Sequence, residues 1–433
     1  MMRRRTRKYV SLVAALLVAV AVPAGAQDCS VVGRNTAVRD ILFDFYLWYR
    51  ELPDTDPALF DSPEAYLDAV RFRPLDQSFS FITDLAAFEA FNENNELVGF
   101  GFSLGLTGPD QLRLFEVYEA SAAWEAGLRR GDFILEIDGR GVSELLATGQ
   151  LGVALGPSEV GVSRVLRWRK PSGSTSSALI TKRTFNIATV GQTGVIDRDG
   201  LSVGYINFRN FSQPSFAALD QSFAEFKARG VVDVVVDLRY NGGGLVDVAT
   251  HLASLIGGLR TNGMVFASVR HNDKHTDLNR QIRFEDPPQT LDLPRVVIIT
   301  SRSSASSSEL VVNGLEPFIP VTLVGDRTFG KPVGQFGFDF CDKIFFPVAF
   351  KTVNANGEGD FFGGIPVDCP AADDVNFALG NPSEASLDEA LHVLRTGTCS
   401  AGAVAIGETL RAQLERHPRL ELEGFQRLTN NAW

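Results

Sequence analysis

The run V-V-D-V-V-V-D-L-R-Y-N-G-G-G (231–244) decides the fold of the central part of this chain. Its first eight residues are mostly β-branched and apolar, which is typical of a strand that is covered on both faces. Gly242, Gly243 and Gly244 end the run, and glycine allows backbone N–H groups to turn toward a ligand. The simpler interpretation is an ordinary strand-to-helix turn, because a glycine triplet alone is weak evidence for a site.

The segments around this run alternate between strand and helix patterns. Residues 201–211 predict a strand, and residues 245–257 predict a helix. Between the strand predicted at 201–211 and the run that begins at residue 231, the sequence is typical of a helix. Ser212 and Pro214 are typical of its start, and Gly230 is typical of its end. The expected apolar face of that helix consists of Phe216, Leu219, Phe223 and Phe226. This alternation predicts an α/β core with a mostly parallel sheet.

A serine and a lysine follow in two short motifs. Ser306 lies in S-A-S-S-S-E (304–309), and Lys331 lies in T-F-G-K-P-V-G-Q (328–335). We expect a helix to begin at Ser306 and a strand, V-T-L-V-G (321–325), to return the chain, which would bring the two side chains together. A serine beside an uncharged lysine can cleave an acyl bond without histidine.

A lysine is a base near neutral pH only if burial favours its uncharged form. Phe329 and the strand before it offer apolar neighbours for Lys331, and Gln335 is placed to hold the amine in line with the hydroxyl. The alternative interpretation of the serine is structural, because Ser306-x-x-Glu309 before an apolar run is also a capping-box signature.

Taken together, these motifs resemble those of the tail-specific, or C-terminal processing, serine protease family. The family patterns D-L-R-x-N-x-G-G, S-A-S-x-S-E and T-F-G-K-G-x-x-Q are similar to residues 237–244, 304–309 and 328–335, in that order. The resemblance extends over roughly residues 35–395. It implies a crotonase-like ββα protease core, for which we expect residues 187–400.

The resemblance also implies a role for each matching residue. Ser306 is the expected nucleophile, Lys331 the general base and Gln335 the residue that orients it. The backbone N–H groups of Gly243 and Ser307 are the expected oxyanion hole. No cofactor and no metal are implied.

Two positions depart from the family pattern. Pro332 stands where the family has glycine, and proline fixes φ and removes an N–H beside Lys331. Ser307 stands where the family has alanine, a change that keeps the backbone N–H. Pro332 is the main support for an alternative function, a catalytically silent relative that serves as a binding or scaffold protein.

Residues 96–186 resemble a PDZ domain, which either precedes the protease core or is inserted in it. The segment A-S-A-A-W-E-A-G-L-R-R-G-D-F-I-L-E-I-D-G (120–139) is similar to the core motif of those domains. Backbone N–H groups in a glycine-containing loop can capture a terminal carboxylate while the peptide adds a strand to the sheet edge. The residues expected to bind a peptide C-terminus are Gly99, Phe100, Gly101 and Phe102.

The first 26 residues read as a signal peptide. A basic start precedes an apolar stretch too short for a comfortable transmembrane helix, and P-A-G-A-Q predicts cleavage after Ala26. Residues 27–95 are expected to form a small helical domain. Its apolar positions at helical spacing are Val38, Ile41, Leu42, Phe45 and Trp48. We therefore predict an exported, periplasmic protein without stable membrane insertion.

The charge and the cysteine content agree with an exported protein. Removal of residues 1–26 takes away five basic residues and no acidic one, so the net charge falls from −11 to −16. Such a chain is a poor ligand for nucleic acids and anionic membranes. The cysteines Cys29, Cys341, Cys369 and Cys399 favour two disulfides in an oxidising compartment. Three pairings are possible, and we expect 341–369 with 29–399.

The histidines offer a rival chemistry. His251 lies in an expected helix, and we interpret it as a packed or surface residue. His271 and His275 lie in a polar stretch without a third ligand, which argues against a metal site. We interpret Arg239 as the partner of a carboxylate and Asp237 as a residue that caps a strand end.

The remaining core sequence predicts strands within 337–365 and a helix over 386–394, and the tail 401–433 is unassigned. The expected function is an exported serine endopeptidase that cleaves proteins near their C-termini, with the PDZ domain engaging the substrate C-terminus. Its partners would be proteins or peptides with exposed C-termini, and an adaptor protein is a further candidate. The sequence does not indicate the oligomeric state.

Overall fold

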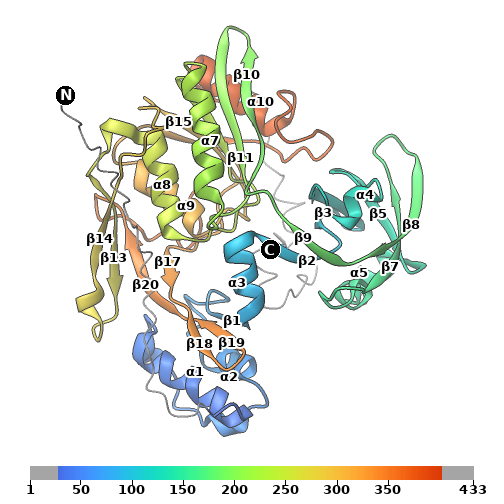
Figure 1. The fold of residues 1–433 in the computed structure, drawn as a ribbon, viewed down its shortest axis with the longest axis vertical. Coiled ribbons are helices and arrows are strands. Elements are labelled where there is room, and N and C mark those ends of the chain that lie inside the picture. Colours follow the sequence, from blue (N-terminus) through green and yellow to red (C-terminus); the bar gives the residue numbers. More distant parts are fainter. Residues whose placement is uncertain (1–27, 402–433) are drawn as a thin grey trace, which may run out of the picture.

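The computed structural model of the chain describes residues 28–401 (Figure 1). The expected signal peptide (1–26) and nearly all of the unassigned tail lie outside the described residues. An N-terminal unit lies at one end of the molecule, a PDZ-like unit lies at the side, and the larger core joins them. No helix within residues 28–401 is long and apolar enough to cross a bilayer.

A six-stranded sheet forms the centre of the core. Its first pair is antiparallel, and all its other neighbours are parallel, so the expected mostly parallel α/β core is confirmed. In spatial order the strands are β10 (Val190–Arg198), β11 (Leu201–Phe208), β12 (Asp233–Asp237), β15 (Val296–Thr300), β16 (Val321–Gly325) and β21 (Cys369–Pro370). The strand predicted at 321–325 is confirmed without a shift.

Strand β12 is buried along its whole length, as its β-branched run predicts. Alternate side chains of a strand point to opposite faces. Val234 and Val236 accordingly pack in the cluster beneath the helices of one face, whereas Val235 packs in the cluster of the other face. The first face carries α7 (Ser215–Ala228), α8 (Val246–Gly257) and α9 (Ser307–Leu315), and the second carries α10 (Ala385–Thr396).

The start of α7 differs from the prediction. Pro214, not Ser212, is the residue at the N-terminal cap of the helix, and the Ser212 hydroxyl donates instead to Asn210 Oδ1 at 2.8 Å. Because Ser212 has a polar partner just before it in the chain, the turn closes two residues later than expected. The predicted apolar face is confirmed, with Phe216 partly buried and the other three residues fully buried.

The PDZ-like unit is inserted between the N-terminal unit and the core. Its two ends pair with each other, because β2 (Glu96–Gly99) lies antiparallel to β9 (Arg183–Asn186). Its main sheet has the order β3-β4-β5-β7-β8, with β6 beside β5, and it encloses a core of its own. The strands are β3 (Phe102–Gly108), β4 (Gln111–Val117), β5 (Phe133–Ile137), β6 (Arg140–Gly141), β7 (Ser163–Arg169) and β8 (Thr175–Thr181). The helices are α4 (Ala122–Glu125), α5 (Val142–Ala147) and α6 (Leu151–Leu155).

The N-terminal unit is helical as expected, with α1 (Val31–Phe45), α2 (Pro63–Val70) and α3 (Leu85–Asn94). It also carries β1 (Phe81–Asp84), which pairs with β19 (Lys343–Phe346), a strand from the distant end of the sequence. Its apolar cluster includes Val333, Phe340, Phe345 and Val348 of the core. The N-terminal unit therefore shares one hydrophobic core with the segment that follows Lys331.

Strands within 337–365 are confirmed and belong to two small sheets. One has the order β1-β19-β18, and the other has the order β14-β13-β20-β17. The strands not yet placed are β13 (Val265–His271), β14 (Arg280–Arg283), β17 (Val333–Gln335), β18 (Phe338–Phe340) and β20 (Val348–Val353). Short 3-10 helices among the described residues are Tyr49–Glu51, Pro57–Leu59, Gly258–Arg260 and Thr276–Leu278.

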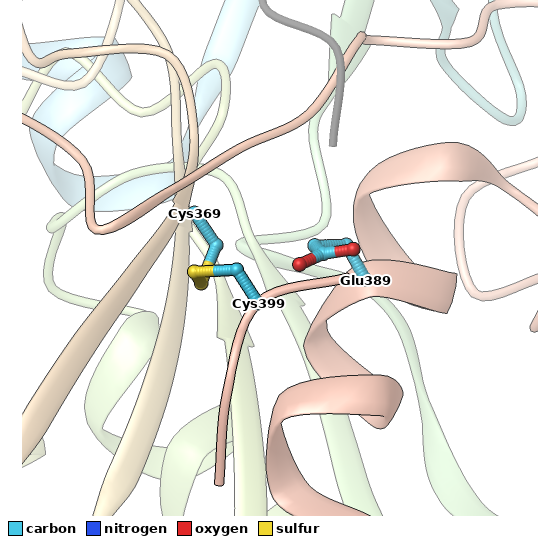
Figure 2. Close-up of side chains that lie close together, drawn as sticks. All are labelled: Cys369, Glu389 and Cys399. Carbon is cyan, nitrogen blue, oxygen red and sulfur yellow. A yellow bond between two sulfur atoms is a disulfide. The ribbon is translucent and has the colours of Figure 1, made fainter. Parts of the chain in front are cut away.

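Both disulfides differ from the expected pairing. The bonds join Cys29 to Cys341 and Cys369 to Cys399, because the first pair lies where β19 meets the N-terminal unit and the second lies where β21 meets the end of α10. Glu389 lies beside the second disulfide (Figure 2). The two sulfurs bind each other and Glu389 accepts the N–H of Ser400, so this group is a structural staple rather than a set of metal ligands.

Candidate active site

The three sequence motifs meet at one edge of the central sheet. Strands β12, β15 and β16 are parallel neighbours, and the carboxyl ends of parallel strands lie at the same edge. The glycine run leaves β12, the serine run leaves β15 and the lysine loop leaves β16. The alternation of strands and helices thus brings together predicted site residues as distant in the sequence as Gly243 and Gln335, which are 92 positions apart.

Ser306 lies at the N-terminal cap of α9, partly exposed and in a rare backbone conformation. Its φ of +55° is in the left-handed region, which costs free energy for any residue other than glycine. Residues held in that region against their preference are concentrated at functional sites. Ser306 and Glu309 also form the capping box that the sequence allowed, so Ser306 caps α9 and in addition has the strained backbone that is common at functional sites.

Lys331 and Gln335 are in direct contact. Lys331 Nζ donates to Gln335 Oε1 at 2.6 Å. The other end of the same amide, Nε2, donates to the carbonyls of Phe79 and Phe346, each at 2.7 Å. Because both amide hydrogens have acceptors, the oxygen of Gln335 is fixed toward the lysine.

The surroundings of the lysine are apolar enough to change its protonation. Burial lowers the pKa of Lys331 to about 8, although the charges of Asp76 and Glu309 act in the opposite direction. The rings of Phe79 and Phe329 lie 5.9 Å apart beside the lysine loop, and Lys331 Nζ is 6.0 Å from the centre of the Phe79 ring. Phe329 was an expected neighbour, whereas Phe79 comes from the N-terminal unit.

Glu309 joins the serine motif to the lysine loop. One carboxylate oxygen, Oε2, accepts the backbone N–H of Ser306 at 2.9 Å and that of Lys331 at 2.8 Å. The other oxygen, Oε1, accepts the N–H of Gly330 at 2.6 Å and the hydroxyl of Thr328 at 2.5 Å. The backbones of the two predicted catalytic residues thus converge on a single, fully buried oxygen atom.

Four donors on one carboxylate favour its ionised form. Burial raises the pKa of Glu309 to about 7, and the hydrogen bonds from Thr328, Lys331, Gly330 and Ser306 oppose this rise. Near pH 8, where half of Lys331 is uncharged, Glu309 is a carboxylate. The sequence offered only one signal for this residue, its place three positions after Ser306.

The residues predicted as an oxyanion hole lie against Ser306. A methyl group added at Gly243 would come within 2.8 Å of Ser306 Cβ and 2.9 Å of the Ser307 nitrogen. The Ser307 N–H has no acceptor among residues 28–401 and opens the first turn of α9. The Gly243 N–H, by contrast, donates to Asn241 Oδ1 at 2.9 Å. One of the two expected donors is therefore engaged by a side chain in this structure.

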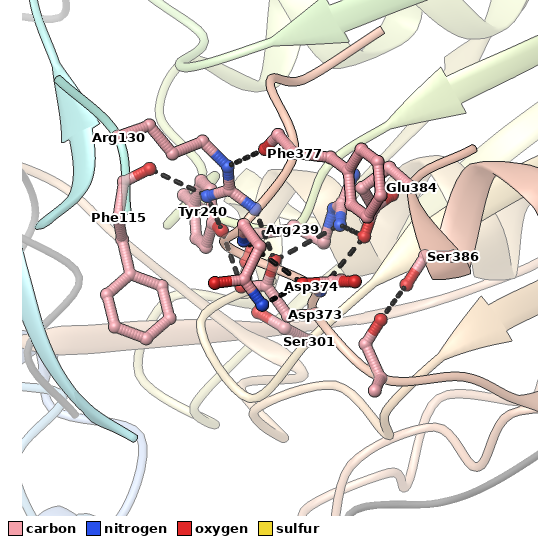
Figure 3. A network of polar contacts seen from close by, with 12 residues as sticks. Phe115, Arg130, Arg239, Tyr240, Ser301, Asp373, Asp374, Phe377, Glu384 and Ser386 are labelled. Atoms are coloured by element: carbon pink, nitrogen blue, oxygen red, sulfur yellow. Dashed lines mark hydrogen bonds and ion pairs between the residues drawn. The ribbon is translucent and has the colours of Figure 1, made fainter. Parts of the chain in front are cut away.

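Buried charges anchor the glycine run, and they also reach the PDZ-like unit (Figure 3). Arg239 is fully buried and pairs with Asp237 at 2.7 Å, with Glu384 at 2.7 Å and with Asp373 at 3.2 Å. Arg130 of the PDZ-like unit pairs with Asp373 at 2.6 Å. Burial alone would raise the pKa of Asp373, but Arg130 and Arg239 outweigh it and hold that pKa below its usual range. The expectation that Arg239 pairs with a carboxylate is confirmed.

The loop predicted to bind a peptide C-terminus has free amides. The carbonyls of Phe100 and Gly101 accept the N–H groups of Ala123 and Tyr118, each at 2.9 Å, whereas their own N–H groups have no acceptor in the described part of the chain. Gly101 has φ +91°, and a side chain there would overlap Ser121. Gly99 ends β2 and Phe102 begins β3, an edge strand of its sheet.

Comparison with known proteins gives the same architecture. Residues 202–370 match the model of peptidase family S41, residues 33–81 match the S41 N-terminal domain and residues 116–151 match a PDZ domain. The chain belongs to peptidase family S41. These are serine-type peptidases of the C-terminal-processing class.

Relatives of this S41 chain carry names of the same kind. A carboxyl-terminal-processing protease of Synechocystis is 26% identical over 71% of this chain and 70% of its own length. Carboxyl-terminal-processing peptidase 1 of Arabidopsis thaliana chloroplasts is 27% identical over 66% of this chain, and the match spans 59% of that protein. The match thus leaves about four tenths of the Arabidopsis protein uncovered.

Solved structures agree with the fold of this S41 peptidase. An S41 protease structure from Bacteroides fragilis has a TM-score of 0.69 and 25% identity, and the match covers 84% of this chain and 97% of that one. The photosystem II D1 C-terminal processing protease has a TM-score of 0.50 at 21% identity over 78% of this chain and 92% of its own. The second likeness concerns the fold alone.

His251, His271 and His275 have hydrogen-bond partners outside the predicted catalytic residues. His251 Nε2 contacts Asp220 at 2.8 Å between α8 and α7, and its ring packs on Phe216. His271 lies at the end of β13 and stacks on Phe336, whereas His275 stacks on Phe45 of the N-terminal unit. The contacts of His251 confirm its interpretation as a packed residue of a helix.

Gly243→Ala should lower turnover about tenfold or more and destabilise the fold by about 1–3 kcal/mol, because the new methyl group meets Ser306 Cβ and backbone atoms at a φ of +103°. Peptide hydrolysis and denaturant unfolding measure the two effects. Gly161→Ala is the matched control, since Gly161 has φ +92° but nothing within 4 Å of the added carbon. Equal loss of turnover in both variants would show that φ strain, not contact with Ser306, explains the effect.

Proposed function

We propose that this chain is an exported endopeptidase that cleaves protein substrates near their C-termini with Ser306 and Lys331. The observation that carries the proposal is the convergence of both residues on Glu309 Oε2, with the amine of Lys331 held by Gln335 and its pKa lowered to about 8. An amine with that pKa is partly uncharged at neutral pH, as a general base must be.

The proposed reaction has two halves. Lys331 Nζ takes the proton of the Ser306 hydroxyl while Ser306 Oγ forms a bond to the scissile carbonyl carbon. The tetrahedral intermediate then breaks its C–N bond, and the ammonium of Lys331 gives its proton to the leaving amine. Water attacks the remaining ester, its proton passes to Lys331, and Ser306 regains a proton as the new carboxyl group leaves.

Backbone amides are proposed to stabilise the oxyanion. The Ser307 N–H is available at the first turn of α9, where the helix dipole also favours negative charge. The Gly243 N–H is the proposed second donor, and it would exchange Asn241 Oδ1 for the developing oxyanion. Removal of such a donor from other serine peptidases costs about 10²–10³-fold in turnover.

The PDZ-like unit is proposed to hold the C-terminus of the substrate. The amides of Phe100 and Gly101 suit a terminal carboxylate, and the edge strand β3 suits an added peptide strand. Gly99 and Phe102 would frame that loop at the ends of β2 and β3.

Export rests on the sequence, because residues 1–26 lie outside the described residues. A basic start, an apolar stretch and the cleavage signal before Gln27 favour an exported, periplasmic protein. The two disulfides between Cys29 and Cys341 and between Cys369 and Cys399 are of the kind that persists in an oxidising compartment.

The pH dependence of the reaction tests the proposed base. Because the uncharged form of Lys331 predominates only above a pKa of about 8, kcat/KM should rise with pH through about 8 and then level off. Below about pH 7 the protonation of Glu309 should remove the remaining activity. A C-terminal peptide hydrolysed between pH 5.5 and 10 gives the profile. A level profile from about pH 6 upward would exclude an amine as the base.

The geometry around Pro332 weakens the alternative of a silent relative. The residue before it, Lys331, keeps its contacts with Glu309 and Gln335, and the carbonyl of Pro332 accepts the N–H of Thr352. The proline thus fits the loop without displacing the lysine. Hydrolysis that is equal and at background level in the wild type and Ser306→Ala would instead favour the binding or scaffold protein.

A further inference from the structure

We propose that Asp76, in the N-terminal unit, is a positioning residue for Lys331 and Gln335. This inference rests on the proposed function of Ser306 and Lys331. It adds that the N-terminal unit supplies part of the catalytic machinery, through one turn that spans residues 76–80.

The side chain of Asp76 stabilises this turn through four hydrogen bonds. Its carboxylate is fully buried and accepts the backbone N–H groups of Phe79 at 2.8 Å and Ser80 at 3.0 Å through Oδ1. Through Oδ2 it accepts the hydroxyls of Tyr46 at 2.9 Å and Ser80 at 2.5 Å. A buried carboxylate with four donors fixes the backbone around it, since each lost bond would leave a buried polar group unpaired.

The turn then reaches the predicted site. The carbonyl of Phe79, whose N–H is held by Asp76, accepts Gln335 Nε2 at 2.7 Å, and this contact helps to aim Gln335 Oε1 at Lys331 Nζ. The Ser80 hydroxyl, which donates to Asp76, accepts the N–H of Val348 at 2.9 Å. Asp76 therefore acts on Lys331 through the chain Phe79, Gln335, Lys331.

The turn is held firmly on the core. The disulfide Cys29–Cys341 and the ion pair of Arg34 with Asp342, at 2.7 Å, fasten the start of the unit. The pairing of β1 with β19 begins at Phe81, one residue after the turn. The turn at 76–80 is thus attached to the core both before and after it in the sequence. This attachment allows the Phe79 carbonyl to hold the Gln335 amide in one orientation.

The negative charge of Asp76 also affects the pKa of Lys331. Burial lowers the pKa of Lys331, and the negative charges of Asp76 and Glu309 limit that fall. Asp76 comes from the N-terminal unit and Glu309 from α9, and these are the two carboxylates that act on the amine. Removal of one of them should leave a weaker base that loses its proton at lower pH.

Two substitutions separate the effect of the Asp76 charge from the effect of its hydrogen bonds. Asp76→Asn keeps the shape and can still accept both backbone N–H groups, so it should shift the rise of kcat/KM to lower pH by about half a unit or more with little change in KM. Asp76→Ala removes the acceptor, so kcat should fall about tenfold to a hundredfold as Gln335 loses its fixed partner. Asp40→Asn, an exposed carboxylate on α1, is the matched control for charge and should leave the profile unchanged.

The experiment uses the whole mature chain, with the unfolding midpoint of each variant recorded beside its pH profile. An unshifted profile for Asp76→Asn together with an unchanged kcat for Asp76→Ala would overturn the inference, as would a loss of kcat that only follows the fraction unfolded. If the wild type depends on Ser306 and Lys331 while these variants behave like it, this inference alone fails. If the wild type itself is inactive, the proposed function fails.

Discussion

Replacing Ser306 by alanine should reduce peptide hydrolysis by about 10³-fold or more, because removal of the nucleophile of a serine peptidase leaves only the rate enhancement of binding and the oxyanion hole. The substitution removes the hydroxyl, which accepts the backbone N–H of Glu309 in the capping box of α9, but it leaves the bond from the Ser306 N–H to the Glu309 carboxylate in place. Hydrolysis of a casein or C-terminal peptide substrate, with matched protein concentrations, measures the loss.

A neighbouring hydroxyl provides the control. Ser308 lies two residues further along α9, and its Oγ donates to the carbonyl of Asn241 at 2.8 Å, so Ser308→Ala removes a structural bond from the same serine run. We expect Ser308→Ala to keep turnover within about tenfold of the wild type, since a single neutral hydrogen bond contributes about 1 kcal/mol. The assignment of the nucleophile would be wrong if Ser306→Ala kept its turnover and Ser308→Ala lost it.

Replacing Glu309 by glutamine should have the second largest effect, with turnover about 10²-fold lower at pH 8 and stability lower by about 1–3 kcal/mol. A carboxylate accepts on both oxygens, whereas an amide presents an NH₂ group on one side. In either orientation of the amide, at least one of the N–H groups of Ser306, Gly330 and Lys331 would face another donor. The serine and lysine loops would then move apart.

Glu316→Gln is the control for this substitution. Glu316 lies at the C-terminal cap of the same helix, α9, and is exposed. The same chemical change there should leave turnover unchanged, and denaturant unfolding of both variants separates stability from catalysis. If Glu309→Gln keeps wild-type turnover, the shared carboxylate is not what sets the distance between Ser306 and Lys331.

The fold of the central core could be predicted well because its signals are local. The β-branched run before the glycines became β12, and 321–325 became β16 without a shift. The segment 120–139, which resembles the core motif of PDZ domains, lies within residues 116–151, which match a PDZ domain. Each of these elements depends on a sequence pattern within a few residues.

Contacts between distant segments could not be predicted in the same way. The disulfide pairing was wrong because it depends on the meeting of β1 with β19 and of α10 with β21, which no spacing between cysteines reveals. For the same reason the sequence did not show that the N-terminal unit shares a core with the segment after Lys331.

The candidate site shows both outcomes. The backbone N–H groups of Ser306 and Lys331 share one oxygen of Glu309, and Lys331 donates to Gln335, so the fold brings the predicted motifs to one place. The catalytic roles of these residues stay a prediction. Glu309 read only as a helix cap, although it contacts both loops, and Asp76 lies in an unremarkable L-D-Q-S-F-S segment more than 200 residues away. Their burial and their hydrogen-bond partners, not their residue type, indicate that these two carboxylates position the predicted catalytic residues.

A fluorophosphonate that labels activated serines tests most directly whether an uncharged Lys331 activates Ser306. Digestion and mass spectrometry of the labelled protein at pH 8 should place the adduct on Ser306, and Lys331→Met should slow labelling by about 10²-fold or more without lowering the unfolding midpoint. An adduct on another serine, or equally rapid labelling of Lys331→Met, would contradict the account.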